Sequence, residues 1–321
     1  MARTLVTGGA GFIGSHLCDR LVEAGDEVIC LDNFFTGRRA NIEKHVRSGA
    51  VEVVRHDITE PILPKALKEF APEIVFHFAA QVNVRRSVDD PVYDATSNLL
   101  GTVAILEASR EVGVKHLIFS STGGAIYGEQ DYFPADEAHP TRPKCPYGVS
   151  KLAAEEYLAY YGRFTKLATT ALRLANVYGP RQNPKGEAGV VAVFTDRLLS
   201  GDSMKVNGDG KQTRDFVYVG DVVAAAIAVS EREATGFDIF NVGRGNEISV
   251  NDVVVAMKKV FSDIAGRDDL EAGSGPALQG EQMRSVISPQ KLSSTLGWKP
   301  KMDFEAGLAT TVKSFLDSAK S

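Results

Sequence analysis

Short strand-like runs alternate with longer segments of helical periodicity along the first half of the chain. Residues 4–6 form a short apolar run that ends in a glycine-rich turn, and apolar residues then recur at helical spacing from Phe12 to Val22. Further strand candidates are 28–31, 51–54, 74–78, 116–119 and 167–174, separated by helical segments such as 63–70, 91–112 and 147–164. Alternating strands and helices form parallel βαβ units, so the pattern predicts an α/β fold with a doubly wound parallel sheet.

The pattern changes after Pro180. A loop is expected over 184–189, a tight turn over 207–210 and an extended segment over 237–242, with helices over 190–199, 221–230 and 250–261. We therefore predict a main domain over residues 1–174, to which later segments return. Residues 175–321 would mainly form a smaller α/β lobe that covers one edge of a cleft.

Composition narrows the classes of protein. The 321 residues carry a formal net charge of −5, which argues against a general nucleic-acid binder. No apolar run is long enough to span a membrane, and the N-terminus reaches its glycines before a signal-peptide core could form, so we expect a cytoplasmic protein. The three cysteines are unpaired in spacing and predict no metal site.

The first turn has the glycine spacing of a dinucleotide-binding loop. Gly8, Gly11 and Gly14 lie between the first strand and its helix, where a backbone without side chains can approach a pyrophosphate. Asp32 ends the next strand 21 residues after Gly11, close to the offset expected of a carboxylate that binds ribose hydroxyls. Since that carboxylate would repel a 2′-phosphate, the pattern favours NAD over NADP, with an ordinary tight turn as the alternative.

A second group of residues offers acid–base chemistry. Tyr147 and Lys151 are four residues apart at the start of a helix, hence on one face, and a nearby cation favours the tyrosine phenolate. Tyr147 is therefore a candidate general base. The hydroxyls of Ser120, Ser121 and Thr122 end a strand, where α/β sheets bind ligands. A packed tyrosine beside a solvated lysine, and a simple strand cap, are the structural alternatives.

These motifs together resemble the extended short-chain dehydrogenase/reductase superfamily, and within it the nucleotide-sugar 4-epimerases, UDP-glucose 4-epimerases above all. The resemblance runs over nearly the whole chain, with the motifs in family order. It rests on 7-TGGAGFIG-14, Asp32-Asn33, 77-HFAA-80, Asn98, Ser120-Ser121-Thr122, Tyr127-Gly128, Tyr147 with Lys151, and 176-NVYGPR-181. It implies a Rossmann-type fold, bound NAD and a UDP-sugar substrate.

The resemblance also implies roles for particular residues. Tyr147 would be the base, Lys151 would bridge the nicotinamide ribose hydroxyls, and Asn98 would be a buried structural residue. Cofactor contacts would come from Gly8, Gly11, Phe12, Ile13, Gly14, Asp32, Asn33, Phe34, Thr36, Gly37, Asp57, Ile58, Phe78, Ala79, Ala80, Gln81, Ser120 and Leu174. Substrate contacts would come from Thr122, Tyr147, Asn176, Val190, Val191, Lys205, Asn207, Arg214, Glu281 and Ser285, with Arg214 the best phosphate ligand.

The chain departs from the family pattern at several positions. Val82 stands where some members have lysine, and Leu278 where epimerases have an arginine that Arg284 could replace. One extra residue after Thr122 leaves open whether Thr122 or Ser121 relays the proton. Gly123 and Gly124 occupy the place of the acidic residues of dehydratases and decarboxylases.

The sequence therefore favours 4-epimerisation of UDP-glucose and UDP-galactose through a transient 4-keto sugar. A UDP-glucuronate 4-epimerase, a nucleotide-sugar dehydratase or decarboxylase, and a non-catalytic NAD-binding sensor are the alternatives. The small Ser285 would leave room for an N-acetyl group in the sugar pocket. The helices expected over 91–112 and from Tyr147 pair across a two-fold axis in related enzymes, which implies a homodimer.

Overall fold

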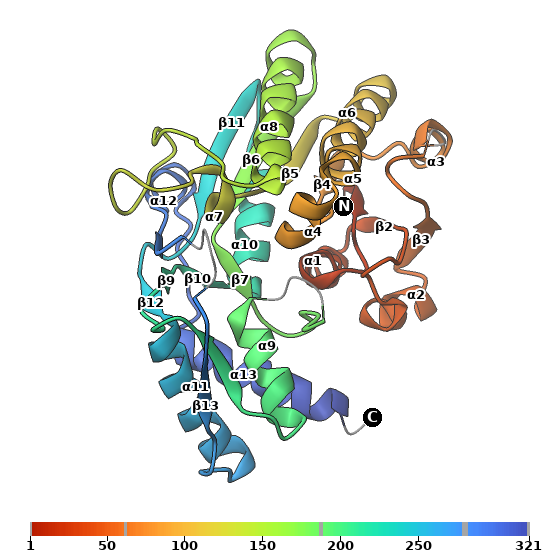
Figure 1. Cartoon of the computed structure of the whole chain (residues 1–321). Helices are drawn as coiled ribbons and strands as arrows, with labels where there is room; N and C mark the ends of the chain where they lie inside the picture. The colour runs from red at the N-terminus through yellow and green to blue at the C-terminus, as the bar shows by residue number, and fades with distance from the viewer. Residues whose placement is uncertain (1, 61–62, 186–188, 278–281, 320–321) are drawn as a thin grey trace.

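A computed structural model of the chain describes residues 2–60, 63–185, 189–277 and 282–319. Within these residues, seven strands form one wholly parallel sheet in the order β11-β6-β5-β4-β1-β2-β3. The order reverses beside β1, which is the doubly wound topology expected from the sequence (Figure 1). The strands are β1 (Arg3–Thr7), β2 (Glu27–Asp32), β3 (Val51–Arg55), β4 (Ile74–His77), β5 (His116–Thr122), β6 (Ala168–Leu174) and β11 (Phe237–Val242).

Helices cover both faces of this sheet because successive strand residues point to opposite sides. In β1, Leu5 packs in one hydrophobic cluster and Val6 in the other. The Val6 cluster includes residues of α1 (Phe12–Glu23), α10 (Val219–Ser230) and α12 (Gln290–Leu296), and α2 (Glu43–Arg47) lies on the same side. The Leu5 cluster includes residues of α3 (Leu63–Phe70), α6 (Gly101–Val112) and α8 (Pro146–Phe164).

The segment expected as one helix over 91–112 is interrupted. It consists of α5 (Pro91–Ala95), a π-helical turn η2 (Thr96–Leu100) and α6, and is preceded by α4 (Val84–Asp89). Asn98 lies in the π-helical turn, and its side chain bonds both backbone groups of Gln81 at 2.9 Å. Such turns are frequent at functional sites, and this one holds Asn98 against the loop that follows β4.

A smaller lobe lies below the sheet in Figure 1. Its hydrophobic cluster joins residues of α9 (Val190–Leu199), α11 (Val250–Ala265) and α13 (Phe304–Ala319). Short strand pairs complete it, namely β7 (Asn176–Tyr178) with β10 (Phe216–Tyr218), β8 (Met204–Asn207) with β13 (Ala272–Gly275), and β9 (Thr213–Arg214) with β12 (Ile248–Ser249) and β14 (Arg284–Ser285). The chain returns to the main sheet partway through this lobe, since β11, which precedes β12 and α11 in the chain, pairs with β6 at the edge of the main sheet.

His77 makes the fold sensitive to acid. It is fully buried at the end of β4, with Nδ1 2.7 Å from Thr7 Oγ1 and Nε2 3.0 Å from Thr102 Oγ1. Burial lowers the pKa of His77 to about 3, and the charge of Lys151 acts in the same direction. Because the unfolded chain takes up this proton near its ordinary pKa of about 6.5, the free energy of unfolding should fall as the pH drops from 6.5 towards 3.

We expect His77 alone to remove roughly 2 kcal/mol of stability between pH 7 and pH 5. Urea unfolding of the wild type and of His77→Asn at both pH values measures this difference. Burial lowers the pKa of His116 to about 4. Because His116 is present in both proteins, its contribution to the loss of stability cancels in the comparison. An equal loss of stability on acidification in the two proteins would contradict the assignment.

Candidate active site

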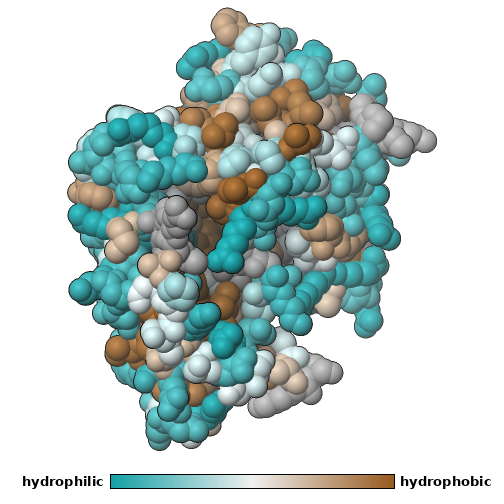
Figure 2. All heavy atoms as spheres, in the orientation of Figure 1, coloured by the Kyte–Doolittle hydropathy of each residue, from teal (hydrophilic) through white to brown (hydrophobic). Residues whose placement is uncertain are grey.

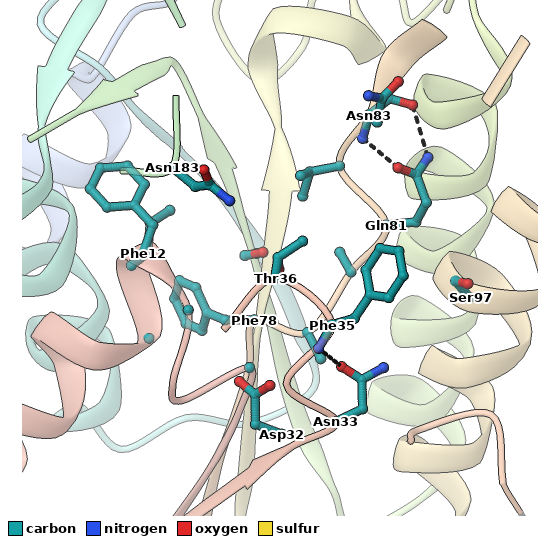
Figure 3. A pocket seen from close by; sticks show the side chains of 18 of the residues that line it. Phe12, Asp32, Asn33, Phe35, Thr36, Phe78, Gln81, Asn83, Ser97 and Asn183 are labelled. Carbon is teal, nitrogen blue, oxygen red and sulfur yellow. Dashed lines mark hydrogen bonds between the residues drawn. The ribbon is translucent and has the colours of Figure 1, made fainter. Parts of the chain in front are cut away.

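A cavity of about 610 Å³ opens at the carboxyl ends of the parallel strands, beside the point where the strand order reverses. Figure 3 shows Asp32 and Asn33 at one end of the site and Gln81 and Asn83 towards the other. Sequence-predicted residues that line it are Gly8, Gly11, Phe12, Ile13, Gly14, Asp32, Asn33, Thr36, Asp57, Ile58, Phe78, Ala79, Ala80, Gln81, Ser120, Ser121, Thr122, Tyr147 and Leu174. Residues far apart in the sequence are therefore brought to one cavity.

The glycine turn is shaped for close contact with a ligand backbone. A Cβ on Gly14 would lie 2.2 Å from the carbonyl oxygen of Gly8, and Gly8 itself has a positive φ of 69°, so neither position suits another residue. Helix α1 begins at Phe12 with no side-chain cap from Gly11. Its first N–H groups and its positive dipole end therefore remain for an anion such as a pyrophosphate, and the turn fits a dinucleotide.

Asp32 is held rigidly beside this turn. One carboxylate oxygen accepts the N–H of Ala10 at 3.0 Å and the other that of Phe34 at 2.8 Å. Burial raises the pKa of Asp32, and the two N–H donors oppose the shift. A carboxylate has about four acceptor sites, so Asp32 keeps capacity for two ribose hydroxyls.

Phe34 and Gly37 do not line the cavity and instead support Asp32. The ring of Phe34 packs against the hydrophobic cluster beneath, and a Cβ on Gly37 would lie 2.8 Å from Asp32 Oδ1. Asn33 donates to Asp57 Oδ2 at 2.8 Å, which joins the ends of β2 and β3. Asn98, predicted to be buried, is 1% exposed and holds Gln81 from behind the cavity.

The tyrosine and lysine lie where the sequence places them, on α8 beside the end of β5. Tyr147 and Thr122 line the cavity, whereas Lys151 is buried behind them with its Nζ 2.8 Å from the carbonyl oxygen of Ser120. Burial lowers the pKa of Lys151 to about 7 and raises that of Tyr147. In the chain itself burial therefore opposes the phenolate that the sequence led us to expect, and a further positive charge in the cavity is needed to favour it.

Ser121 has a different environment from Thr122. Its hydroxyl donates to Glu155 Oε1, and Glu155 is paired in turn with Arg173 at 2.7 Å, both side chains being at most 5% exposed. Side chains alternate along a strand, so Ser121 and Thr122 point in opposite directions. Of the two hydroxyls, Thr122 is the one without a buried carboxylate partner among the described residues.

The expected substrate residues of the smaller lobe that the structure describes do not line this cavity. Asn176 begins β7, and Val190 and Val191 begin α9. Lys205 and Asn207 lie in β8, while Arg214 and Ser285 pair between β9 and β14. Leu278 and Glu281 lie outside the described residues.

The structure defines the surroundings of Ser285 and Arg284. Ser285 is 3% exposed. The guanidinium of Arg284 binds both carboxylate oxygens of Glu247, at 2.8 and 2.7 Å. Its donors therefore already have a partner, so it is poorly suited to replace the family arginine that falls on Leu278.

Sequence reasoning missed part of the cavity wall, made by Phe35, Arg38, Asn41, His56, Asn83, Arg86, Tyr93, Ser97, Ala175, Val177, Gln182 and Asn183. Arg86 lies 3.8 Å from the ring centroid of Tyr93 and 5.4 Å from that of Phe35. No local sequence motif predicts this stack of Phe35, Arg86 and Tyr93, because it joins the loop after β2 to α4 and α5. Arg181, which also lines the cavity, belongs to the 176–181 motif that carried the resemblance.

The described residues contain no cluster of potential metal ligands and no helix of the length and hydropathy needed to cross a bilayer.

The UDP-glucose 4-epimerase of Mycolicibacterium smegmatis is 42% identical over 99% of this chain and 100% of its own length. The crystal structure of UDP-glucose 4-epimerase from Thermotoga maritima, determined with UDP-glucose, superimposes with a TM-score of 0.92 at 42% identity over 99% of both chains. The Thermus thermophilus UDP-glucose 4-epimerase, determined in complex with NAD, gives 0.89 at 44% identity over 98% of this chain and 99% of its own.

A protein family also matches this chain, over the residues that form the site. The NAD dependent epimerase/dehydratase family matches residues 4–243, which include the glycine turn, Asp32 and the Tyr147 and Lys151 pair. The match covers most of the chain. The chain belongs to the NAD dependent epimerase/dehydratase family.

Proposed function

We propose that this protein is an NAD-dependent 4-epimerase of UDP-glucose and UDP-galactose. The observation that carries the proposal is that Tyr147 and Thr122 line the same cavity as the dinucleotide turn, with Lys151 buried directly behind them. The likeness to UDP-glucose 4-epimerases over the whole chain supports the choice of substrate.

The glycine turn, Asp32 and the 78–81 loop would hold NAD, which when bound supplies a reversible hydride acceptor for C4 of the sugar. Tyr147 takes the proton of the C4 hydroxyl and later returns it, so it acts as base and then as acid. Lys151 contributes positive charge behind the phenolate, and the Thr122 hydroxyl relays the proton between Tyr147 and the sugar. Rotation of the 4-keto sugar within the site would present the opposite face of C4 to the hydride. Return of the hydride to that face would give the C4 epimer with no net oxidation.

The scarcity of acidic residues in the described cavity wall favours epimerisation over elimination of water. Of its described lining residues only Asp32 and Asp57 are acidic, and both lie at the strand ends expected to hold the adenosine. Gly123 and Gly124 begin α7 (Gly123–Ile126), where dehydratases and decarboxylases need an acid. A non-catalytic sensor would need neither the base nor the buried cation.

The function is tested with the protein as purified, without added NAD. We expect bound NAD, and not NADP, in an extract of the denatured protein, and conversion of UDP-galactose to its C4 epimer. UDP-glucuronate and UDP-N-acetylglucosamine are assayed in parallel. Turnover that depends strictly on added NADP, or of UDP-glucuronate alone, would contradict the proposal.

Turnover of UDP-N-acetylglucosamine shows whether the sugar pocket is wide enough for an N-acetyl group. Ser285 is buried, and tyrosine at this position would be overpacked, so Ser285→Tyr changes stability as well as volume. The comparison of wild-type rates on the two substrate pairs is therefore the cleaner measurement. Undetectable turnover of the N-acetylated pair would contradict the open pocket.

Thr122 and its neighbour Ser121 are the two candidates for the hydroxyl that relays the proton. We expect Thr122→Val to lower kcat by about 10-fold or more, because it removes a proton path and little volume. Ser121→Ala should instead lower the free energy of unfolding by about 1–2 kcal/mol and leave kcat within a few fold, because it removes a buried partner of Glu155. A crippled Ser121→Ala beside a normal Thr122→Val would assign the relay to Ser121.

The proposed assembly is a homodimer in the cytoplasm. Apolar side chains gather over α8 and the neighbouring helices (Figure 2), where Val88, Val92, Leu100, Val149, Tyr157, Tyr160 and Phe164 are exposed. An apolar face of this kind favours a partner helix pair, as in a four-helix interface between two copies. None of the three cysteines forms a disulfide, in keeping with a reducing compartment.

Light scattering tests the dimer. We expect the wild type to be dimeric at micromolar concentration and Leu100→Glu to be monomeric, because a charge in the apolar face must be desolvated on association. Val255→Glu is the matched control, since Val255 is 68% exposed and Leu100 59%, but Val255 lies on α11 in the smaller lobe. A monomeric wild type would remove the proposal.

A further inference from the structure

A buried carboxylate connects the cavity wall to the helix that carries Tyr147 and Lys151. Asp94 lies on α5, which packs against α8, and is 0% exposed. Its Oδ1 accepts the side-chain amides of Gln81 at 2.8 Å and Asn98 at 3.0 Å, and its Oδ2 accepts the Ser150 hydroxyl at 2.7 Å. Ser150 directly precedes Lys151, so one carboxylate fixes both the 78–81 loop and the first turns of α8.

The charge of Asp94 has no cationic partner in direct contact. Among the described residues it makes no ion pair with lysine, arginine or histidine, whereas the other buried acid of this region, Glu155, is paired with Arg173. An unpaired charge this deeply buried is costly unless a nearby opposite charge offsets it. Lys151, buried one residue beyond Ser150, is the cation available on α8 to do so.

The surroundings of Lys151 support this charge balance. Asp94 and Glu155 both raise the pKa of Lys151 against the larger effect of burial, and Asp94 also raises the pKa of Tyr147. The other groups that face the pair are the carbonyl oxygen of Ser120 and the ring of Phe119 on β5, the neutral His77 on β4, and Cys145 at the start of α8. Asp94 is therefore the unpaired acid that acts on both members of the pair.

We propose that Asp94 is a positioning residue for the reaction, which keeps Lys151 charged and fixes the start of α8 against the cavity wall. The inference rests on the proposed function for its kinetic consequence, but not for its electrostatic one. A purely structural role would require only the three hydrogen bonds. The two roles predict different results for a variant that removes the charge and keeps the shape.

Loss of the Asp94 charge has a definite sign. Without it the Lys151 cation is less stabilised and the Tyr147 phenolate less repelled, so both groups titrate at lower pH. In Asp94→Asn we expect both limbs of the pH profile of kcat to move about one pH unit to lower pH, as macroscopic values of the coupled pair. A structural defect alone would lower kcat and leave the two limbs where they are.

A measurement independent of activity accompanies the kinetics. The Lys151 amine is titrated by nuclear magnetic resonance in protein containing isotope-labelled lysine, with Lys151→Arg to assign its signal. We expect its midpoint, about 7 in the wild-type chain, to fall in Asp94→Asn. Asp94→Ser, a smaller neutral replacement, gives the same reading if the asparagine variant does not fold.

Two controls separate charge from docking. Asp90→Asn makes the same chemical change at the exposed N-cap of α5 and should move neither limb nor the lysine midpoint. Ser150→Ala breaks the bond to α8 but keeps the charge, so it should lower kcat without a shift. An unshifted Lys151 midpoint in a folded, neutral Asp94 variant overturns the inference, whereas an inactive wild type with a shifted midpoint contradicts only the proposed function.

Discussion

We expect Tyr147→Phe to lower kcat for UDP-galactose epimerisation by at least about 100-fold while the affinity for UDP stays nearly unchanged. The substitution removes one oxygen from a residue that lines the same cavity as the glycine turn and leaves its ring in place. In the proposed mechanism that oxygen takes the proton of the C4 hydroxyl and contributes little to holding the nucleotide. The loss should therefore appear in kcat and not in the dissociation constant.

The measurement combines steady-state kinetics with calorimetric titration of UDP. Tyr157→Phe is the matched control, because Tyr157 lies on the same helix with its side chain exposed to solvent. We expect that control to stay within a few fold of the wild type. A Tyr147→Phe variant that keeps a tenth or more of the wild-type kcat would remove Tyr147 as the base and direct attention to another cavity hydroxyl.

The features that could be predicted from the sequence are local in the chain. The glycine turn, the strand that ends at Asp32 and the four-residue spacing of Tyr147 and Lys151 depend on neighbours within one βαβ unit or one helix. The segment expected as a helix over 190–199 is α9, with the same bounds. Periodicity and turn chemistry are sufficient for such features.

The features that could not be predicted join distant segments. Asp94 looks like a surface acid in sequence, and only the packing of α5 against α8 buries it. The same holds for the stack of Phe35, Arg86 and Tyr93, and for the pairing of Glu155 with Arg173 on β6. The raised pKa of Tyr147 also results from burial, which spacing does not report. Each of these features depends on distances between segments far apart in the chain, which the spacing of apolar residues along the sequence does not predict.

The pair of Glu155 and Arg173 leads to the largest expected change in stability. Arg173 Nη2 lies 2.7 Å from Glu155 Oε2, its Nε donates to both carboxylate oxygens, and its Nη1 donates to the Tyr127 hydroxyl at 3.0 Å. Both side chains are nearly inaccessible to solvent. Arg173→Met would leave Glu155 charged, buried and without its cation, which we expect to lower the free energy of unfolding by about 3–5 kcal/mol.

Urea unfolding at pH 7 measures this loss, and two further variants show its cause. Arg47→Met removes an exposed arginine from its pair with Glu43 and should cost less than about 1 kcal/mol. The double variant Glu155→Met with Arg173→Met removes both charges at once, so it should be more stable than Arg173→Met alone. If the double variant is instead no more stable than Arg173→Met alone, the energy lies in packing against β6 and not in the ion pair. Recovery in the double variant would mean that the charged pair is not needed for stability.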